Sequence, residues 1–577
     1  MGDYKIQTLA FAAGSAGEAT VPGPTIRFKA CAQYRLTFVN NAQKPYKPYI
    51  DTSAVTNLHL HGIHVNGDAP ADDVTLVLEV GQSYTYTYNM PCDHAGGTFF
   101  YHTHIHGITA LQVASGAVGA LLVDDHPSEL ASRPASWPDM EEHVLVLLRV
   151  DASSVSDPAP AVAAASGDSS DKGSRRGPTS FSALRALFKW LLGEESRPTS
   201  KAITAPKKQT EAVADGSSLE TDANGALLQG ASIPSLCSSL ACTWFSSTGT
   251  PPASQFYLAN GRYKPTFALG AANTWHRLRL VHASQNGVGV QFDIVASSGQ
   301  GTGACSVFLL GRDGVLLPTL PRPLAPTSAT STPLLFANVA TRADVAVSCP
   351  CAAEVCTYDI VYRGSTVVAS LVVAADEAAP APPAPLPTWA PCRPYYLRDL
   401  QSETVAGTFS VALGGSTVNG ISFSAHTPQY TFEPWSTQEW TVLNIDAHPF
   451  HLHAQPFQLV ANIPVGGPPG WYQIGDWQDT ISSAGMSGVD STALNGAIHN
   501  HNHAHAHGGA RRMLSFDVGS GFASKIRFRT EYTNKVMVHC HILTHEDAGA
   551  MALTLSTGNH GITAYQINPA NEFLCPA

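Results

Sequence analysis

Four short histidine clusters lie far apart along this chain, two near its start and two near its end. They read HLHG at 59–62, HTH at 102–104, HPFHLH at 448–453 and HCHILTH at 539–545. Imidazole and thiolate groups are ligands that suit copper, so these ten histidines and one cysteine are candidate copper ligands. A site that uses all four clusters requires a fold in which the two ends of the chain meet.

The last cluster predicts a strand whose residues contact two separate metal centres. It follows residues 525–530 (KIRFRT), and the apolar run 536–538 leads directly into it. Successive side chains of a strand point to opposite faces, so His539 and His541 would share one face and Cys540 would take the other. One short segment can therefore contribute ligands to two centres.

The cysteine indicates a blue-copper centre. One cysteine and two histidines in a trigonal arrangement form the electron-transfer type of copper site, and Cys540 with His448 and His545 supplies that set. Scattered surface or core histidines are the alternative for any single residue, but they do not account for four His-x-His pairs. Eight imidazoles are enough to hold three copper ions. The pairs are His59/His61, His102/His104, His451/His453 and His539/His541.

On these motifs the chain resembles the three-domain multicopper oxidases of the laccase type, in particular their bacterial and algal members. The matching stretches are 56–62 (TNLHLHG), 97–107 (GTFFYHTHIHG), 448–457 (HPFHLHAQPF) and 539–551 (HCHILTHEDAGAM). The resemblance implies an all-β fold of three cupredoxin-like Greek-key β-sandwich domains. It also implies copper as the cofactor and O2 as the electron acceptor.

The resemblance further implies a role for each ligand position among four copper ions, one of type 1, one of type 2 and two of type 3. Cys540, His448 and His545 would hold the type 1 ion, and His59 and His451 the type 2 ion. Single electrons from a donor would pass through Cys540 to its flanking histidines and reduce dioxygen to water. The type 3 pair would be held by the remaining six histidines, which are His61, His102, His104, His453, His539 and His541.

Two carboxylates match family positions associated with proton delivery, which water formation requires. They are Glu546 and Asp72, and the neighbouring Asp73 is an alternative to Asp72. One position departs from the family, because many members carry an axial methionine five residues after the last histidine. Here that residue is Ala550, which predicts a three-coordinate type 1 copper of higher potential. A register shift by one residue, which would make Met551 the ligand, remains open.

Patterning predicts three β-sandwich domains. Alternating segments separated by Gly, Pro or Asn, as at 34–39, 75–80, 84–88 and 119–123, are typical of such folds. The predicted domains are residues 1–150 with type 2 and type 3 ligands, residues 236–376 without a copper motif, and residues 395–577 with ligands of all three types.

The connecting segments have different compositions. Residues 151–235 are rich in Ala, Ser, Pro and Gly and predict a low-complexity insertion, within which 181–193 has the spacing of a short amphipathic helix. Residues 377–394 predict a proline-rich linker. The tract HNHNHAHAH at 499–507 predicts a flexible polar loop, with weak copper binding as the alternative. The histidines outside the ligand positions are interpreted as ordinary: His64, His94, His106, His276 and His282.

Composition limits the partners and the compartment. The net charge of −11 argues against nucleic acid as a binding partner. The sequence contains no run of 18 apolar residues, so no transmembrane helix is expected. The start, MGDYKIQTLAF, does not have the pattern of a signal peptide. Ten cysteines besides Cys540 nevertheless favour an oxidising compartment, so an extracellular or periplasmic location is expected, with pairings that the sequence does not specify.

Three functions compete on the sequence. The first is an oxidase of phenols or similar small organic donors, and it is the function predicted here. The second is a metallo-oxidase for Cu(I) or Fe(II), although only seven methionines occur and no methionine-rich segment is present. The third is a non-catalytic structural or interaction protein, which is disfavoured because all eleven ligand positions are filled.

Overall fold

A computed structural model describes most of the chain outside the predicted insertion. The described residues are 4–14, 19–42, 54–151, 241–245, 255–287, 289–297, 303–375, 383–461, 467–483, 523–559, 561 and 573–575. The predicted insertion beyond residue 151, its helix at 181–193 and the histidine tract at 499–507 therefore lie outside the described residues.

The N-terminal part forms strands where apolar and polar residues alternate. In β5 (Gln33–Val39) the buried residues Tyr34, Leu36 and Phe38 face the core, and the strand pairs with β7 (Ser83–Asn89). A four-stranded sheet runs in the spatial order β4 (Gly23–Phe28), β9 (Val118–Val123), β8 (Gly97–His102) and β6 (His59–His61). Two further pairs are β2 (Phe11–Ala12) with β3 (Ala19–Thr20), and β1 (Tyr4–Thr8) with β11 (Ala241–Phe245).

The predicted strand at 75–80 is wrong. Leu78 makes only an isolated bridge to Thr56, and no ladder extends from it. Side-chain amides take the place of a partner strand, because Asn57 donates to the carbonyl of Leu76 (3.1 Å) and Asn40 to the carbonyl of Leu78 (2.8 Å). The segment alternates like a strand, but its carbonyls are already bonded by asparagine.

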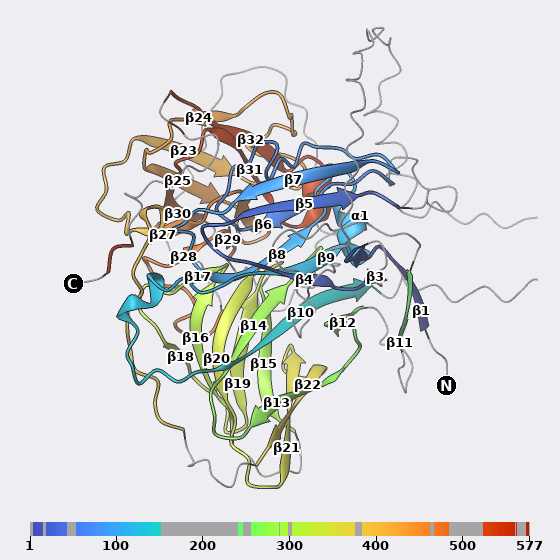
Figure 1. Cartoon of the computed structure of the whole chain (residues 1–577), viewed down its shortest axis with the longest axis vertical. Helices are drawn as coiled ribbons and strands as arrows, with labels where there is room; N and C mark the ends of the chain where they lie inside the picture. The colour runs from blue at the N-terminus through green and yellow to red at the C-terminus, as the bar shows by residue number, and fades with distance from the viewer. Residues whose placement is uncertain are drawn as a thin grey trace, which may run out of the picture. The chain divides into compact units, whose positions relative to one another are not determined.

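Two sheets make up the middle part, and they are called the middle sheets below (Figure 1). The first follows the order β12 (Gln255–Ala259), β10 (Glu141–Asp151), β14 (His276–His282), β20 (Arg342–Ser348), β16 (Ser306–Arg312) and β17 (Val315–Leu316), with β18 (Arg322–Leu324) beside β16. The second follows β13 (Thr266–Ala271), β22 (Thr366–Ala374), β21 (Val355–Tyr362), β15 (Val290–Ala296) and β19 (Ser331–Ala337).

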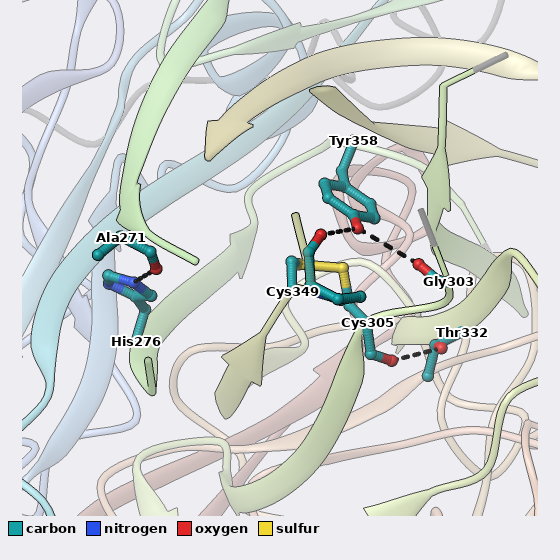
Figure 2. The surroundings of a disulfide bond; sticks show 8 residues. Ala271, His276, Gly303, Cys305, Thr332, Cys349 and Tyr358 are labelled. Carbon is teal, nitrogen blue, oxygen red and sulfur yellow. Dashed lines mark hydrogen bonds between the residues drawn. A yellow bond between two sulfur atoms is a disulfide. The ribbon is translucent and has the colours of Figure 1, made fainter. Parts of the chain in front are cut away.

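The middle sheets share one apolar core, and the disulfide between Cys305 and Cys349 joins the adjacent ends of β16 and β20 within the first of them (Figure 2). Tyr358 of β21 donates a hydrogen bond to the carbonyl of Gly303 (3.3 Å), next to the start of β16. Thr332 of β19 donates to the carbonyl of Cys305 (2.7 Å). The polar groups at this end of the core therefore connect one sheet to the other.

Strand β10 belongs by its pairing to the middle sheets. It runs parallel to β14 and antiparallel to β12. The predicted N-terminal domain ended at residue 150, so the structure assigns the last strand of that segment to its neighbour.

The C-terminal part contains two five-stranded sheets around a separate apolar core (Figure 1). One follows β23 (Gly407–Ala412), β25 (Gln438–Leu443), β30 (Ala523–Phe528), β27 (Phe457–Ala461) and β28 (Trp477–Gln478). The other follows β24 (Tyr430–Phe432), β32 (Met551–Ser556), β31 (Asn534–Cys540), β26 (Phe450–Leu452) and β29 (Thr480–Ile481).

Helices are few among the described residues, which confirms the predicted all-β class. They are α1 (Thr109–Ala114), α4 (Leu543–Asp547) and two 3-10 turns, η2 (Glu129–Ser132) and η4 (Tyr395–Leu397). None of the described helices has the length and apolar character needed to cross a membrane. Four disulfides occur among the described residues, Cys31–Cys92, Cys305–Cys349, Cys351–Cys356 and Cys392–Cys575, whereas Cys540 is free.

Candidate metal centre

Strand pairing places the histidine clusters side by side within each end of the chain. In the N-terminal sheet His59 of β6 stands opposite His102 of β8. In the C-terminal sheet His451 of β26 stands opposite His539 of β31. Residues opposite each other on a ladder point to the same face, so each pair of clusters presents its rings on one side of its sheet.

The two ends of the chain then meet ring to ring. His61 stacks on His451 with centroids 3.8 Å apart, and His59 stacks on His453 at 4.3 Å. The Nε2 atom of His541 lies 3.3 Å from Nδ1 of His61. The eight rings of the four predicted pairs therefore form one buried cluster built from both ends.

Within the cluster, groups of three ring nitrogens converge to within 4.8 Å of one another. The groups include His59 with His61 and His102, His59 with His451 and His453, and His104 with His453 and His539. Three histidine nitrogens at this separation suit the coordination of a transition metal.

Unpartnered ring nitrogens provide a test of whether the cluster fits a metal. The Nε2 atoms of His59, His102 and His451 are buried and accept or donate no hydrogen bond within the described residues. A buried polar atom without a partner carries a free-energy cost and requires an explanation. Bound copper supplies one, since each free nitrogen points into the cluster.

The opposite ring nitrogens are held by the protein. Nδ1 of His59 bonds to Asp72 (2.7 Å), Nδ1 of His102 to the carbonyl of Thr103 (2.8 Å), and Nδ1 of His451 to the carbonyl of Asp479 (2.8 Å). Contacts of this kind fix the ring orientation and leave Nε2 as the donor atom.

Burial keeps four rings of the cluster neutral, those of His61, His102, His451 and His539. It lowers the pKa of His61, His102 and His451 well below the ordinary value, with neighbouring rings adding to the shift. It lowers the pKa of His539 to about 3. A neutral imidazole is the metal-binding form, so these four rings need no deprotonation before they bind a cation near neutral pH.

A second, smaller group lies behind β31. Sγ of Cys540 is 3.4 Å from Nδ1 of His448 and 3.6 Å from Nδ1 of His545, and the two nitrogens are 3.1 Å apart. Burial raises the pKa of the Cys540 thiol. A thiolate at this position therefore requires an adjacent cation, and one cysteine with two histidines is the ligand set of a type 1 copper.

The register of β31 and β32 places Ala550 beside this group. Met551 stands opposite His539 and so shares the face of the histidine cluster. The amide of Cys540 donates to the carbonyl of Ala550, and Ala550 packs in an apolar cluster with Cys540 and Ile542. This arrangement agrees with the predicted register, in which alanine occupies the place of the axial methionine.

Comparison with known proteins identifies the family. A family model described as multicopper oxidase matches residues 12–128, and a second model with the same description matches residues 391–559. Both segments contain the histidine clusters. The chain belongs to the multicopper oxidases. The resemblance to multicopper oxidases that the motifs indicated is thus confirmed at the level of the family.

Similar proteins agree with this assignment. The chain is 33% identical over 138 residues to multicopper oxidase LPR1 of Arabidopsis thaliana, a match that spans 21% of this chain and only 24% of that relative. A multicopper oxidase of Campylobacter jejuni, described as a metallo-oxidase, superposes with a TM-score of 0.53 at 16% identity, covering 94% of this chain and 87% of the other.

A laccase-like multi-copper oxidase of Ochrobactrum sp., described as active towards lignin model compounds, superposes with a TM-score of 0.53 at 16% identity and covers 96% of both chains. At this identity the likeness establishes the fold alone, which confirms the predicted cupredoxin-like architecture.

Both predicted acids lie against the histidine cluster of this multicopper oxidase. Asp72 accepts from the amide of Leu60 (2.9 Å) as well as bonding His59. Asp73, the alternative, instead pairs with Lys535 at 2.8 Å.

Glu546 is fully buried and lies 3.4 Å from Nδ1 of His104 and 3.5 Å from Nδ1 of His539. Burial raises its pKa well above the usual range, and the charge of Asp547 adds to the shift. Its Oε2 has no hydrogen-bond partner among the described residues. The side chain therefore presents a carboxyl oxygen directly to the cluster.

Sequence reasoning missed a third acid at the cluster, Asp479. It lies 3.2 Å from Nε2 of His61 and forms a two-pronged ion pair with Arg342. The only local signal is its position between the buried residues Trp477 and Ile481, where an acid requires a partner.

Sequence reasoning also missed the part played by His64. Its Nε2 lies 2.9 Å from Oε2 of Glu531, and its Nδ1 lies 3.1 Å from the carbonyl of Ala454. The ring stacks on Tyr396 at 4.0 Å. His64 is therefore a buried link between the N-terminal and C-terminal parts rather than an ordinary histidine.

Proposed function

We propose that this chain couples the one-electron oxidation of phenolic or similar small organic donors to the four-electron reduction of O2 to water. The observation that supports this most is the convergence of all eleven predicted ligands in two groups that the segment 539–541 joins. His539 and His541 belong to the histidine cluster, and Cys540 belongs to the smaller group. A non-catalytic relative has no need to keep both groups complete, with buried nitrogens left unpartnered.

Four copper ions fit the two groups. Cys540, His448 and His545 would hold the type 1 ion, while His59 and His451 would hold the type 2 ion. When bound, copper supplies the one-electron redox chemistry that no protein side chain here provides. The type 3 pair would be held by His61, His102, His104, His453, His539 and His541.

Cys540 connects the two groups by covalent bonds, because His539 and His541 are its direct neighbours in the chain. The expected entry point for an electron is His545, whose side chain is partly exposed, whereas His448 is only 8% exposed. The proposed donor therefore approaches α4, at the surface that His545 shares with the exposed Thr544.

Two carboxylates support the proton side of the reaction. Glu546 is the proposed donor of protons to the cluster, since its unpartnered Oε2 faces His539. Asp72 is the proposed second group, and it also orients His59 through a 2.7 Å contact. Positioned acids of this kind contribute typically about 10²–10⁴-fold to rate.

The donor class differs among proteins of this fold. Of the two solved structures described above, one is named a metallo-oxidase and the other an oxidase of lignin model compounds, so the fold does not select between them. Oxygen uptake measured with a panel of phenols, bilirubin, ascorbate, Cu(I) and Fe(II) tests the proposal. Rapid uptake with phenols supports it, and uptake with Cu(I) or Fe(II) alone replaces it with the metallo-oxidase alternative.

An extracellular or periplasmic location fits the same proposal. The four disulfides among the described residues are compatible with such a compartment, since disulfides persist where the environment is oxidising. Fractionation of the native host, followed by oxidase assay of each fraction, tests the location.

A further inference from the structure

A buried arginine of the middle sheets reaches the histidine cluster. Arg342 opens β20 and is fully buried, and its guanidinium pairs with both carboxylate oxygens of Asp479. The contact through Oδ1 is 2.8 Å long. Asp313 contacts the same arginine: its Oδ1 accepts from the Arg342 backbone amide at 2.9 Å and lies 3.6 Å from Nη1. The middle sheets thus extend a charged group to the metal centre although they carry no copper motif.

Asp479 in turn contacts one histidine from each end of the chain. Its Oδ1 lies 3.2 Å from Nε2 of His61, and its backbone carbonyl accepts from Nδ1 of His451 at 2.8 Å. These two rings stack on each other at 3.8 Å. One residue therefore sets the orientation of both rings at the point where the two ends of the chain meet.

The contact with Asp479 determines which nitrogen of His61 faces the cluster. Because Nε2 of His61 bonds the carboxylate, its Nδ1 is the nitrogen that faces Nε2 of His541 at 3.3 Å. His59 and His451 have the opposite arrangement, with Nδ1 held by the protein and Nε2 free. Loss of the carboxylate would leave the His61 ring without the group that fixes its orientation.

Asp479 itself is not available as a metal ligand. Its Oδ1 accepts from Arg342 and from the hydroxyl of Thr480 (2.9 Å), and its Oδ2 is engaged by Arg342. The backbone of Gly62, which has a φ of +91°, lies close against this ion pair, and a Cβ there would overlap both Asp479 and Arg342. The guanidinium of Arg342, which belongs to β20 of the middle sheets, therefore fixes the position of the Asp479 carboxylate.

We propose that Arg342 is a positioning residue for the three-copper site, acting through the Asp479 carboxylate to hold His61, and with it the ring of His451 stacked on His61, in their ligating orientations. The inference rests on the proposed copper-dependent function and extends it. It gives the middle sheets a part in oxygen reduction, in place of a role as a spacer. Bidentate pairing is a property of arginine that lysine does not reproduce.

A second arginine of the middle sheets provides a matched control. Arg322 pairs with Asp476 at 2.7 and 2.9 Å, also between buried groups of the middle and C-terminal parts. Asp476 lies only three positions before Asp479, but no contact connects it to a histidine of the cluster among the described residues. The variants R342Q and R322Q therefore each remove a two-pronged ion pair between these parts, although Asp476 keeps its contact with Arg312 (3.1 Å) in R322Q. Only R342Q removes a pair that touches a ligand.

The experiment compares copper binding in the full-length wild type, R342Q, R342K and R322Q. The readouts are the dissociation of type 2 and type 3 copper under competition with a chelator, the type 2 electron paramagnetic resonance spectrum, and the blue absorption of type 1 copper. We expect R342Q to bind the three-copper set roughly 10–100-fold more weakly, the usual effect of removing a group that orients a ligand, while its blue absorption persists. R342K should recover part of this loss, and R322Q should bind copper like the wild type.

Equal copper affinity and identical type 2 spectra in R342Q, R322Q and the wild type would overturn the inference. If R342Q does not fold, D479N decides the question in the same assay, since it keeps the size of the side chain and weakens the pairing. A D479N protein with the wild-type spectrum and affinity would again overturn it. A wild type that binds only the type 1 ion refutes the proposed function itself, which keeps the two failures distinct.

Discussion

Replacing His64 should be among the most destabilising single changes at the junction of the two copper-bearing ends. His64 and Glu531 have side chains 3% and 7% exposed and lie 2.9 Å apart. Removing one member of a buried pair typically costs about 3–5 kcal/mol, because the other is left buried without its partner. We expect His64→Ala to lower the free energy of unfolding by about this amount, with the lost stacking on Tyr396 included.

A matched variant separates this cause from simple loss of packing. Nδ1 of His64 faces the carbonyl of Ala454, and Nε2 faces Oε2 of Glu531. The hydrogen bond between His64 and Glu531 therefore requires a proton between Nε2 and Oε2. In Glu531→Gln the amide can donate to Nε2 while Nδ1 keeps its bond to Ala454. The expected cost of Glu531→Gln is therefore only about 1 kcal/mol.

Urea unfolding of the copper-free chain, followed by tryptophan fluorescence and circular dichroism with coincident transitions, measures both variants. Lys29→Ala serves as a surface control, since Lys29 is 74% exposed and 4.0 Å from Asp124, and such pairs contribute about 0–1 kcal/mol. The reasoning is refuted if His64→Ala costs no more than Lys29→Ala, or if Glu531→Gln costs as much as His64→Ala.

Four further changes test the copper sites and their dependence on the rest of the chain. Ala550→Met should lower the type 1 potential, because a thioether would then reach the metal, and Met551→Leu should leave that potential unchanged. Redox titration of the blue band measures both potentials. The opposite pattern would show that the register is wrong. Glu546→Gln should slow oxygen reduction by about 10²–10⁴-fold without slowing reduction of the type 1 site, as stopped-flow absorption would record. Deletion of residues 155–230 should leave copper content and oxygen reduction intact, because their composition does not favour a packed core, and loss of copper would show that they belong to the fold.

The ligand residues were predictable from the sequence because their chemistry is local. A His-x-His or His-Cys-His spacing fixes which faces the side chains take on a strand, and no distant contact is needed to recognise it. The alternation in β5 was predictable for the same reason, whereas β14, also a predicted strand, is buried along its whole length. The position of Ala550 also followed from counting residues after His545.

The buried ion pairs that connect different parts of the chain around the cluster were not predictable, because their partners are remote in the sequence. Arg342 and Asp479 are 137 positions apart, and His64 and Glu531 are 467 apart. Nothing in the local pattern around Arg342 distinguishes it from the other arginines of the middle sheets.

The strand predicted at 75–80 failed for a related reason. Its alternation is real, but Asn40 and Asn57, distant from it in the sequence, already bond its carbonyls. Pairing likewise decides that β10 belongs with β14 rather than with the strands that precede it. Patterns along the chain predict elements, whereas the partners of those elements depend on the fold.

Metal analysis and spectroscopy of the wild type and Cys540→Ser test the central claim most directly. The account predicts four coppers and an intense blue colour in the wild type. In Cys540→Ser it predicts loss of the colour and of phenol-dependent oxygen uptake, with the type 2 resonance retained, since the histidine cluster does not use the Sγ atom. A Cys540→Ser protein that oxidises phenols at the wild-type rate would contradict the account.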